Sequence, residues 1–172
     1  MRKPNILLTG TPGCGKTTLA GELADRLQLT HLNISQIVKQ QDLHEGHDAE
    51  WDTYILDDDR VVSHLRPLIE QGGMIVDFHS ADVFPNEWFD LVLVLRTDNS
   101  NLVPRLRNRG YTAKKIEENL DCEIMGVCLE EAKTHYEGMC AVQPLQSDVP
   151  EDLERNVEQV VAWHAAFLRD NQ

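Results

Sequence analysis

Residues 6–18 read ILLTGTPGCGKTT and carry the most informative pattern of this 172-residue chain. The first three are apolar and short enough for a buried strand, and the segment after them matches G-x-x-x-x-G-K-[ST] between Gly10 and Thr17. An amphipathic segment then begins at Lys16. In such a loop, successive main-chain N–H groups point inward at an anion, and the following helix adds the positive end of its dipole. The pattern therefore predicts a strand, a phosphate-binding loop and a helix, against the alternative of a glycine-rich turn that fits by chance.

Six positions of this loop are expected to contact ATP: Gly13, Cys14, Gly15, Lys16, Thr17 and Thr18. A side chain at either glycine would obstruct the approach of phosphate. Lys16 is expected to reach the β and γ oxygens as a catalytic point charge, and the Thr17 hydroxyl to supply one ligand to Mg²⁺. The Thr18 hydroxyl can donate to the α-phosphate. Cys14 is interpreted as a small filler of the loop rather than a nucleophile, because no base is evident near it in the sequence.

A carboxylate is also needed at the end of a neighbouring strand, where it would orient the hydration shell of the magnesium ion. Asp77 fits this role because it ends the apolar run of residues 74–76, where a buried charge would otherwise be costly. Capping of a following turn is the alternative. His79 would point to the same side if the strand continues, so that it could orient a water molecule or the transferred group. A histidine that only makes a hydrogen bond is the other interpretation.

The rest of the chain alternates short apolar runs with longer amphipathic segments, which is typical of an α/β domain with a parallel sheet. The polar segment 44–48 predicts a solvated loop rather than a metal site, since it lacks the H-E-x-x-H spacing. Pro104 is compatible with its helix only within the first turn. The expected strands cover residues 5–9, 31–33, 74–78, 91–95 and 139–142, and the expected helices cover residues 16–27, 57–70, 100–108, 113–136 and 150–169.

The chain is strongly acidic. Sixteen Lys and Arg residues against 29 Asp and Glu residues give a net charge of −13. Such a chain repels a nucleic-acid backbone and attracts a basic protein, so we expect no direct nucleic-acid binding. Neither a signal peptide nor a run of bilayer-spanning length is found, which predicts a soluble intracellular protein with no membrane partner. The four cysteines lack C-x-x-C or zinc-like spacing and are expected to be reduced thiols.

Charge is unevenly distributed along the chain. Residues 42–60 contain eight acidic residues and one arginine, whereas residues 96–115 contain six basic residues and one acid. Phosphoryl transfer demands positive charge around the γ-phosphate, so cations that close over it would stabilise the transition state. Arg105 and Arg109 lie four residues apart, directly before Gly110, which makes them candidates for a mobile catalytic clamp. A solvated helix face is the alternative.

The sequence as a whole resembles a known family, the nuclear adenylate kinase of the isoenzyme 6 type, also described as a coilin-interacting nuclear ATPase. The resemblance runs nearly end to end, and its motifs together are far more specific than the phosphate-binding loop alone. They are PNILLTGTPG at residues 4–13 with GKTT at 15–18, ILD at 55–57 with DRVV at 59–62, IVD at 75–77 with His79, FP at 84–85, WF at 88–89, VLRTD at 94–98, RGY at 109–111 and CEI at 122–124.

The resemblance implies the fold of a P-loop nucleoside monophosphate kinase. This is one domain over residues 1–172, with five parallel strands flanked by helices. A nucleoside-monophosphate-binding insertion is expected at about residues 33–56, and a short lid at about residues 108–118. The implied activity is reversible transfer of a phosphoryl group from ATP to AMP with Mg²⁺, accompanied by ATP hydrolysis.

The resemblance also assigns roles to particular residues by position. Arg109 belongs to the lid and contacts ATP, and Asp77 with His79 stands where ordinary adenylate kinases have Asp-Gly. In the monophosphate region the family usually has Gly-Asp-Leu and an arginine, whereas this chain has Ser-Gln-Ile at residues 35–37 and Lys39. Lys39 is therefore the expected AMP-binding residue, and it keeps the positive charge but not the bidentate fork of an arginine.

The resemblance further implies a link to maturation of the small ribosomal subunit and its 18S rRNA through a basic ribosomal protein, with residence in nucleus and cytoplasm. We expect a monomer. Two functions follow: a nucleoside monophosphate kinase, or a regulatory ATPase that binds this ribosomal protein and uses hydrolysis as a switch. A kinase of another small metabolite is a third possibility, and a GTPase is disfavoured because the chain has no Asn-Lys-x-Asp motif.

Overall fold

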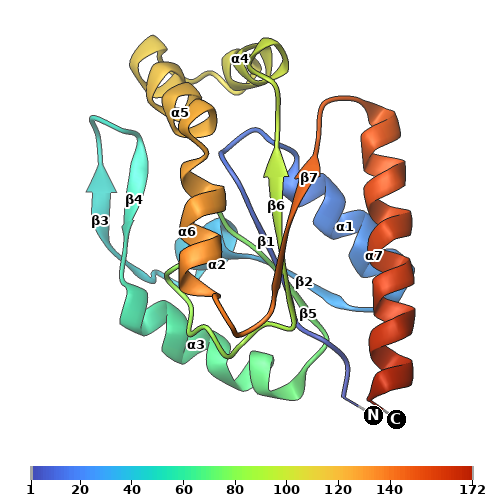
Figure 1. The fold of residues 1–172 in the computed structure, drawn as a ribbon. Helices are drawn as coiled ribbons and strands as arrows, with labels where there is room; N and C mark the ends of the chain where they lie inside the picture. The colour runs from blue at the N-terminus through green and yellow to red at the C-terminus, as the bar shows by residue number, and fades with distance from the viewer. Residues whose placement is uncertain (1, 172) are drawn as a thin grey trace.

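A computed structural model describes residues 2–171 as an α/β fold built around a parallel sheet (Figure 1). The sheet has five strands in the order β2-β5-β1-β6-β7, and every neighbouring pair is parallel. This confirms the fold class that the sequence predicts. The five strands are β1 (Ile6–Thr9), β2 (Thr30–Asn33), β5 (Met74–Asp77), β6 (Leu91–Arg96) and β7 (Ala141–Gln146).

Helices cover both faces of this sheet (Figure 1). Because side chains alternate along a strand, Ile6 and Leu8 of β1 point to one face and Leu7 to the other. Ile6 and Leu8 pack in a core with α1 and α7, whereas Leu7 packs in a second core with α2, α3 and α6. The helices are α1 (Lys16–Leu27), α2 (Ile34–Gln40), α3 (Asp58–Gln71), α4 (Asn99–Asn108), α5 (Ala113–Met125), α6 (Val127–His135) and α7 (Pro150–Asp170).

The segment between β2 and α3 has more regular structure than the sequence predicts. The expected loop at residues 44–48 is instead strand β3 (His44–Asp48), which pairs with β4 (Thr53–Leu56) in an antiparallel hairpin. Every residue of β3 is at least partly exposed, so the apolar alternation that marks a strand is absent. Helix α2 precedes the hairpin and is also unexpected; its N-cap is Asn33, whose side chain accepts from the main-chain N–H of Gln36 at 3.1 Å.

Three further boundaries differ from the prediction. The helix expected over residues 113–136 is two helices, because Gly126 has a φ of +66° and caps α5. Strand β7 extends to Gln146 instead of ending at residue 142, since a proline is tolerated in an edge strand. Helix α4 begins at Asn99, which leaves Pro104 in its second turn rather than its first.

The carboxyl ends of the strands form the edge of the sheet at which the candidate site lies. Since the strands run in parallel, the segments that follow β1, β5, β6 and β7 meet along this edge. Helices α4 and α5 lie beyond it, and the β3–β4 hairpin stands beside α5 (Figure 1). Among residues 2–171, no helix combines the length and the apolar character that a bilayer span requires.

Candidate active site

The loop between β1 and α1, residues 10–17, is called the P-loop below. Gly10, Gly13 and Gly15 have φ values of +140°, +90° and +95°, a range that favours glycine. Packing also requires two of them. A Cβ at Gly10 would lie 2.8 Å from the Leu95 carbonyl oxygen, and one at Gly13 would lie 2.9 Å from the Leu106 side chain. A side chain at either of these two glycines would therefore clash with the protein itself, besides obstructing a phosphate.

Helix α1 begins at the P-loop and brings positive charge to it. Its N-cap residue is Gly15, which has no side chain that could accept from the first turn. The Lys16 side chain lies along the loop, where its Nζ donates to the carbonyl oxygens of Gly10 at 2.8 Å and Thr11 at 3.2 Å. The ammonium group and the positive end of the helix dipole therefore lie together, which suits the binding of a phosphate.

Asp77 ends β5 beside the P-loop, and three polar groups approach its carboxylate. Oδ2 accepts from Thr17 Oγ1 at 2.8 Å and from Asn33 Nδ2 at 3.3 Å, and it lies 3.2 Å from His31 Nε2. Only 4% of the Asp77 side chain is exposed. The Thr17 hydroxyl and the Asp77 carboxylate are the hard oxygen ligands that Mg²⁺ prefers, and they are adjacent, so this donor set fits the ion.

The structure joins Thr17 to Asp77, the two residues that the sequence predicts for the metal, but it adds two that the sequence does not indicate. His31 and Asn33 lie on β2, which pairs with β5 so that Asn33 stands opposite Asp77. The only signal that could identify them is the pairing of these two strands. That pairing joins segments more than 40 residues apart, so no local pattern reveals it.

His79 follows β5 and lies in the wall of a cavity. Its main-chain oxygen accepts from Thr9 Oγ1 at 3.1 Å and from Cys128 Sγ at 3.7 Å, which fixes the backbone. The His79 side chain is exposed toward the main and third cavities, whose walls lie around the ring. The resulting desolvation, with the positive charges of Lys16 and Lys115, lowers the pKa of His79 to about 4. His79 is therefore neutral near pH 7 and can orient a group by hydrogen bonding without contributing charge.

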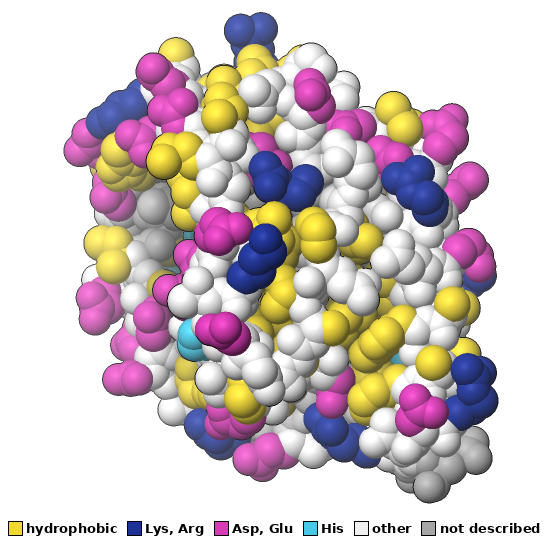
Figure 2. All heavy atoms as spheres, viewed as in Figure 1, with side chains coloured by type: hydrophobic (Ala, Val, Ile, Leu, Met, Phe, Trp, Pro, Cys, Tyr) yellow, Lys and Arg dark blue, Asp and Glu magenta, His cyan; other side chains and the backbone are white. Residues whose placement is uncertain are grey.

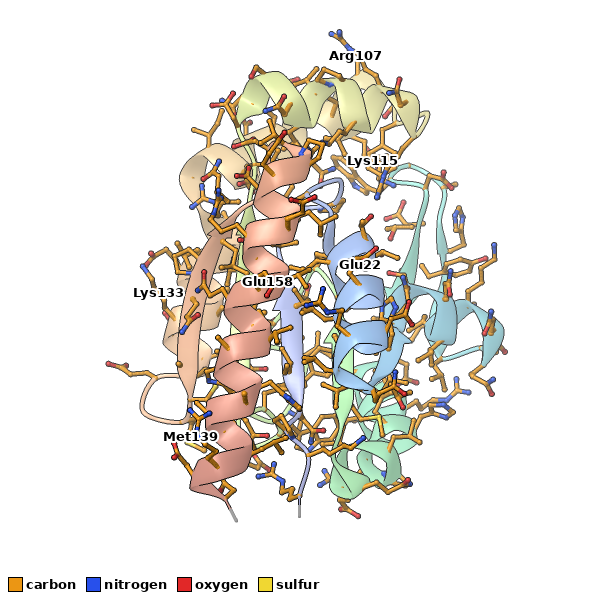
Figure 3. All side chains as sticks on the ribbon, turned by 90° about the vertical axis from the view of Figure 1, so that its right-hand side faces the viewer. Glu22, Arg107, Lys115, Lys133, Met139 and Glu158 are labelled. Carbon is orange, nitrogen blue, oxygen red and sulfur yellow. The ribbon has the colours of Figure 1, made fainter. Side chains whose placement is uncertain are left out.

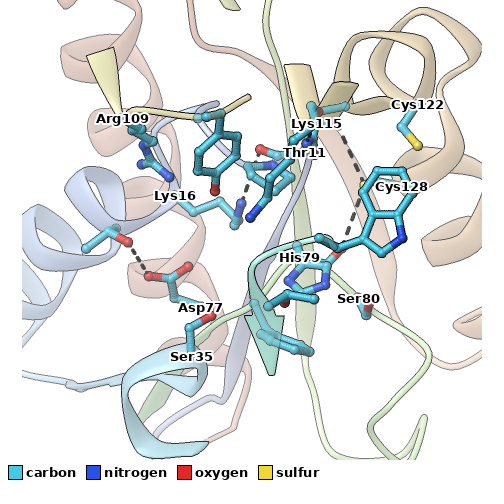
Figure 4. Close-up of a pocket in the computed structure, with 18 of the residues that line it drawn as sticks. Thr11, Lys16, Ser35, Asp77, His79, Ser80, Arg109, Lys115, Cys122 and Cys128 are labelled. Carbon is cyan, nitrogen blue, oxygen red and sulfur yellow. Dashed lines mark hydrogen bonds between the residues drawn. The ribbon is translucent and has the colours of Figure 1, made fainter. Parts of the chain in front are cut away.

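The P-loop, the end of β5, the hairpin and the segment after α4 surround this main cavity, which has a volume of about 570 Å³ (Figure 4). Lys16, Arg109 and Lys115 bring positive charge to it from three separate elements. Such a concentration of cations beside a P-loop suits a polyphosphate. The acidic residues of its lining are Asp52, Asp77 and Glu131.

Contacts between the hairpin and the start of α5 close one side of the main cavity. Lys114 forms an ion pair with Glu50, and its Nζ lies 4.2 Å from the centre of the Trp51 ring. Lys115 Nζ donates to the main-chain oxygen of Asp52 at 3.1 Å. Two segments that are distant in the sequence thus meet over the cavity.

A second cavity of about 440 Å³ adjoins the P-loop and shares Gly13, Gly15 and Arg109 with the main one. Thr18 also lines it, as do residues 147–149, which connect β7 to α7, and Pro150 at the start of α7. Ser147 Oγ donates to the Cys14 carbonyl oxygen at 2.6 Å and so attaches this connection to the P-loop. Sequence reasoning misses residues 147–150, because nothing in their composition indicates a ligand.

A third cavity of about 440 Å³ lies between α2, the hairpin and the segment after β5. It shares Tyr54, Phe78 and His79 with the main cavity, so the two adjoin each other. Its lining is mixed, with apolar side chains beside the carboxylates of Asp58 and Asp82. Burial, followed by the charge of Asp82, raises the pKa of Asp58. A cavity that combines apolar side chains with hydrogen-bond acceptors suits a flat base that carries N–H donors.

Arg105 and Lys39 do not line the main cavity. The Arg105 guanidinium donates to the main-chain oxygens of Ser147 and Asp148, both at 2.9 Å, and more weakly to that of Gly13 at 3.4 Å. It lines the second cavity but not the main one, to which the structure brings Arg109 instead. Lys39 is exposed on α2 and lines none of the three cavities. Its binding of AMP therefore stays a prediction from the resemblance.

Comparison with known proteins connects this geometry with a family. Residues 6–126 match the protein family described as AAA domain. The chain is 48% identical to "Adenylate kinase isoenzyme 6 homolog" of Dictyostelium discoideum, over 98% of this chain and 96% of that protein. It is also 48% identical to "Adenylate kinase isoenzyme 6 homolog FAP7" of Saccharomyces cerevisiae, over 98% of this chain and 85% of that protein. The chain belongs to the adenylate kinase isoenzyme 6 family.

Membership of the adenylate kinase isoenzyme 6 family explains why this kinase-type fold carries a nucleotide-binding P-loop. Solved structures support the fold. A shikimate kinase from Acinetobacter baumannii in complex with shikimate superimposes with a TM-score of 0.66 at 16% identity, over 95% of this chain and 94% of that one. At this identity the likeness shows the fold alone.

Proposed function

We propose that this chain is a nucleoside monophosphate kinase, which transfers a phosphoryl group from ATP to AMP and also hydrolyses ATP. One observation carries the proposal. The second and third cavities each share lining residues with the main cavity, where Lys16, Asp77 and His79 lie, so they adjoin it on different sides. A donor held on one side and an acceptor held on the other would therefore bring their phosphates together at these residues.

ATP would occupy the P-loop and the second cavity. Main-chain amides of the loop and the Lys16 ammonium would bind its phosphates, while its adenosine would lie against residues 147–150 and Arg109. Thr17 and Asp77 would hold Mg²⁺, which neutralises phosphate charge when it is bound.

AMP would occupy the third cavity, with its phosphate turned toward the main one. The carboxylates of Asp58 and Asp82 can accept from the amino group of adenine, which favours AMP over a base with a carbonyl at that position. Residues 33–56 would form the monophosphate-binding region, because α2 and the hairpin build much of this cavity.

In the reaction, the bond between the γ-phosphorus and the ADP oxygen breaks, and a bond to a phosphate oxygen of AMP forms. Lys16, Arg109 and Lys115 would stabilise the negative charge of the transition state, and neutral His79 would orient the acceptor by a hydrogen bond. Residues 108–118 would act as a lid. Contact of this lid with the hairpin would exclude water, which otherwise competes as acceptor.

The proposal is tested by incubating the purified full chain with MgATP, with and without AMP, and by measuring ADP and free phosphate. We expect two ADP for each AMP consumed. Lys16→Ala should abolish both transfer and hydrolysis, whereas Lys133→Ala, an exposed change on α6, should alter neither. Release of free phosphate with no consumption of AMP would overturn the kinase proposal and favour an ATPase switch.

We further propose a role in maturation of the small ribosomal subunit through a basic ribosomal protein. The net charge of −13 supports this proposal because it would attract a basic partner. The acidic residues of segment 42–60 contribute to the negative charge along the margin of the molecule where the hairpin lies (Figure 2). Binding of a purified basic ribosomal protein should weaken steeply as salt rises. Failure to bind at low salt would refute this partner.

A further inference from the structure

Glu123 of α5 is a buried charged residue to which the proposed reaction gives no role. Only 4% of its side chain is exposed. Its Oε1 accepts from Arg96 Nε at 2.8 Å and from the Thr97 main-chain N–H at 3.0 Å, and its Oε2 accepts from Thr11 Oγ1 at 2.6 Å. A buried carboxylate is costly unless it is paired and hydrogen-bonded, and this one is joined to the end of β6 and to the P-loop.

The contact with Thr11 reaches the P-loop lysine through one residue. The Thr11 main-chain oxygen accepts from Lys16 Nζ at 3.2 Å and from the Cys14 N–H at 3.2 Å. Thr11 itself is 1% exposed, so its hydroxyl has little access to water as an alternative partner. The orientation of Thr11, and with it one of the oxygens that hold Lys16, therefore depends on the Glu123 carboxylate.

A second contact approaches the P-loop from the other end of the segment 108–118. This segment contains the connection 109–112 between α4 and α5, which includes Arg109, and the first turns of α5. On the α4 side, Arg105 donates to the Gly13 oxygen at 3.4 Å, and on the α5 side, Glu123 accepts from the Thr11 hydroxyl. Both helices that flank the segment are therefore attached to the loop that it would cover.

We propose that Glu123 is a positioning residue. It lines none of the three cavities, and it acts through Thr11 to fix Lys16 and to couple the P-loop to α5. The effect on catalysis rests on the proposed kinase function, whereas the coupling itself does not. Because many amides bind the phosphates in the ground state, loss of the coupling should affect the reaction step more than nucleotide affinity.

The test uses two substitutions at Thr11 rather than at Glu123. Removal of Glu123 would leave Arg96 without its partner and could prevent folding. Thr11→Val removes only the hydroxyl, at nearly constant volume, and Thr11→Ser retains it. We expect kcat of Thr11→Val to fall about 10- to 100-fold, as misplacement of a catalytic group does, while the Kd for MgADP changes less than about threefold. Thr11→Ser should recover most of the lost kcat.

Amide hydrogen exchange without nucleotide supplies a measurement that is independent of activity. In Thr11→Val, exchange at residues 10–16 and 119–126 should be about tenfold faster than in Thr11→Ser, with α7 unchanged. If the wild-type chain binds MgADP but transfers no phosphoryl group, the kinase proposal fails and exchange still tests the coupling. Equal exchange in the two variants would overturn the coupling. Faster exchange with an unchanged kcat in an active enzyme would overturn the positioning role.

Discussion

The substitution Arg105→Met tests whether this arginine stabilises the fold or acts as the catalytic clamp that the sequence suggests. Methionine keeps much of the aliphatic stem and removes the guanidinium. The change would break two hydrogen bonds of 2.9 Å, to the main-chain oxygens of Ser147 and Asp148, and a weaker one to Gly13. These bonds join α4 to the P-loop and to the connection before α7, so we expect the loss to destabilise the fold.

The magnitude follows from the two short bonds. A hydrogen bond to a charged group contributes about 1.5–3 kcal/mol, and because Arg105 is only partly buried we take the lower value, which gives about 3 kcal/mol for the two. For a chain of this size each kcal/mol lowers Tm by about 2–4 °C, so Tm should fall by about 6–12 °C. Arg107 is the matched control, because it is exposed on the same helix and points away from the molecule (Figure 3).

The assay is thermal unfolding followed by circular dichroism, with Arg105→Met, Arg107→Met and wild type in one buffer. Arg107→Met should change the free energy of unfolding by less than about 0.5 kcal/mol, or about 2 °C in Tm. If both variants melt within about 2 °C of each other while Arg105→Met alone loses kcat by about 1,000-fold, the reasoning is refuted and Arg105 is the clamp.

Three other predictions concern the main cavity. By NMR, His79 should titrate with a pKa of about 4, and a midpoint near 6.5 would contradict this. Because the folded state binds the proton less readily than the unfolded state, the contribution of His79 to folding stability is complete above pH 6.5 and declines as pH falls from 6.5 toward 4. Asp77→Asn should lower kcat at least about 100-fold, and a loss below about threefold would exclude a role in holding Mg²⁺. Lys114→Ala breaks the ion pair with Glu50 and should raise the ratio of ATP hydrolysis to phosphoryl transfer, measured as free phosphate per ADP. An unchanged ratio would show that this contact does not exclude water from the site.

Local pattern and burial explain which elements the sequence predicts well. Strands β1, β5 and β6 are buried on both faces, so each is a continuous apolar run, and helix α1 begins and ends at the expected residues 16 and 27. The hairpin at residues 44–56 is the opposite case. Both of its strands are largely exposed and they pair with each other, and β3 is polar, so the composition of residues 44–48 indicates a loop.

Residues of the site divide in the same way. The P-loop and Asp77 are predictable because a chemical requirement coincides with a local pattern of strand, loop and helix. His31 and Glu123 are not, since each acts on a residue more than 40 positions away, His31 on Asp77 and Glu123 on Thr11. For Arg105, the local pattern and the structure point to different roles. Its spacing from Arg109 suits a clamp, whereas its hydrogen bonds are to backbone oxygens that the spacing does not reveal.

Calorimetric titration of the full chain with MgADP tests most directly whether the P-loop is a nucleotide site. We expect saturable binding of one nucleotide at the loop, with an affinity that falls at least about tenfold in Lys16→Ala and hardly at all in Lys133→Ala. Absence of saturable heat from folded wild-type protein, or equal affinity in wild type and Lys16→Ala, would contradict it.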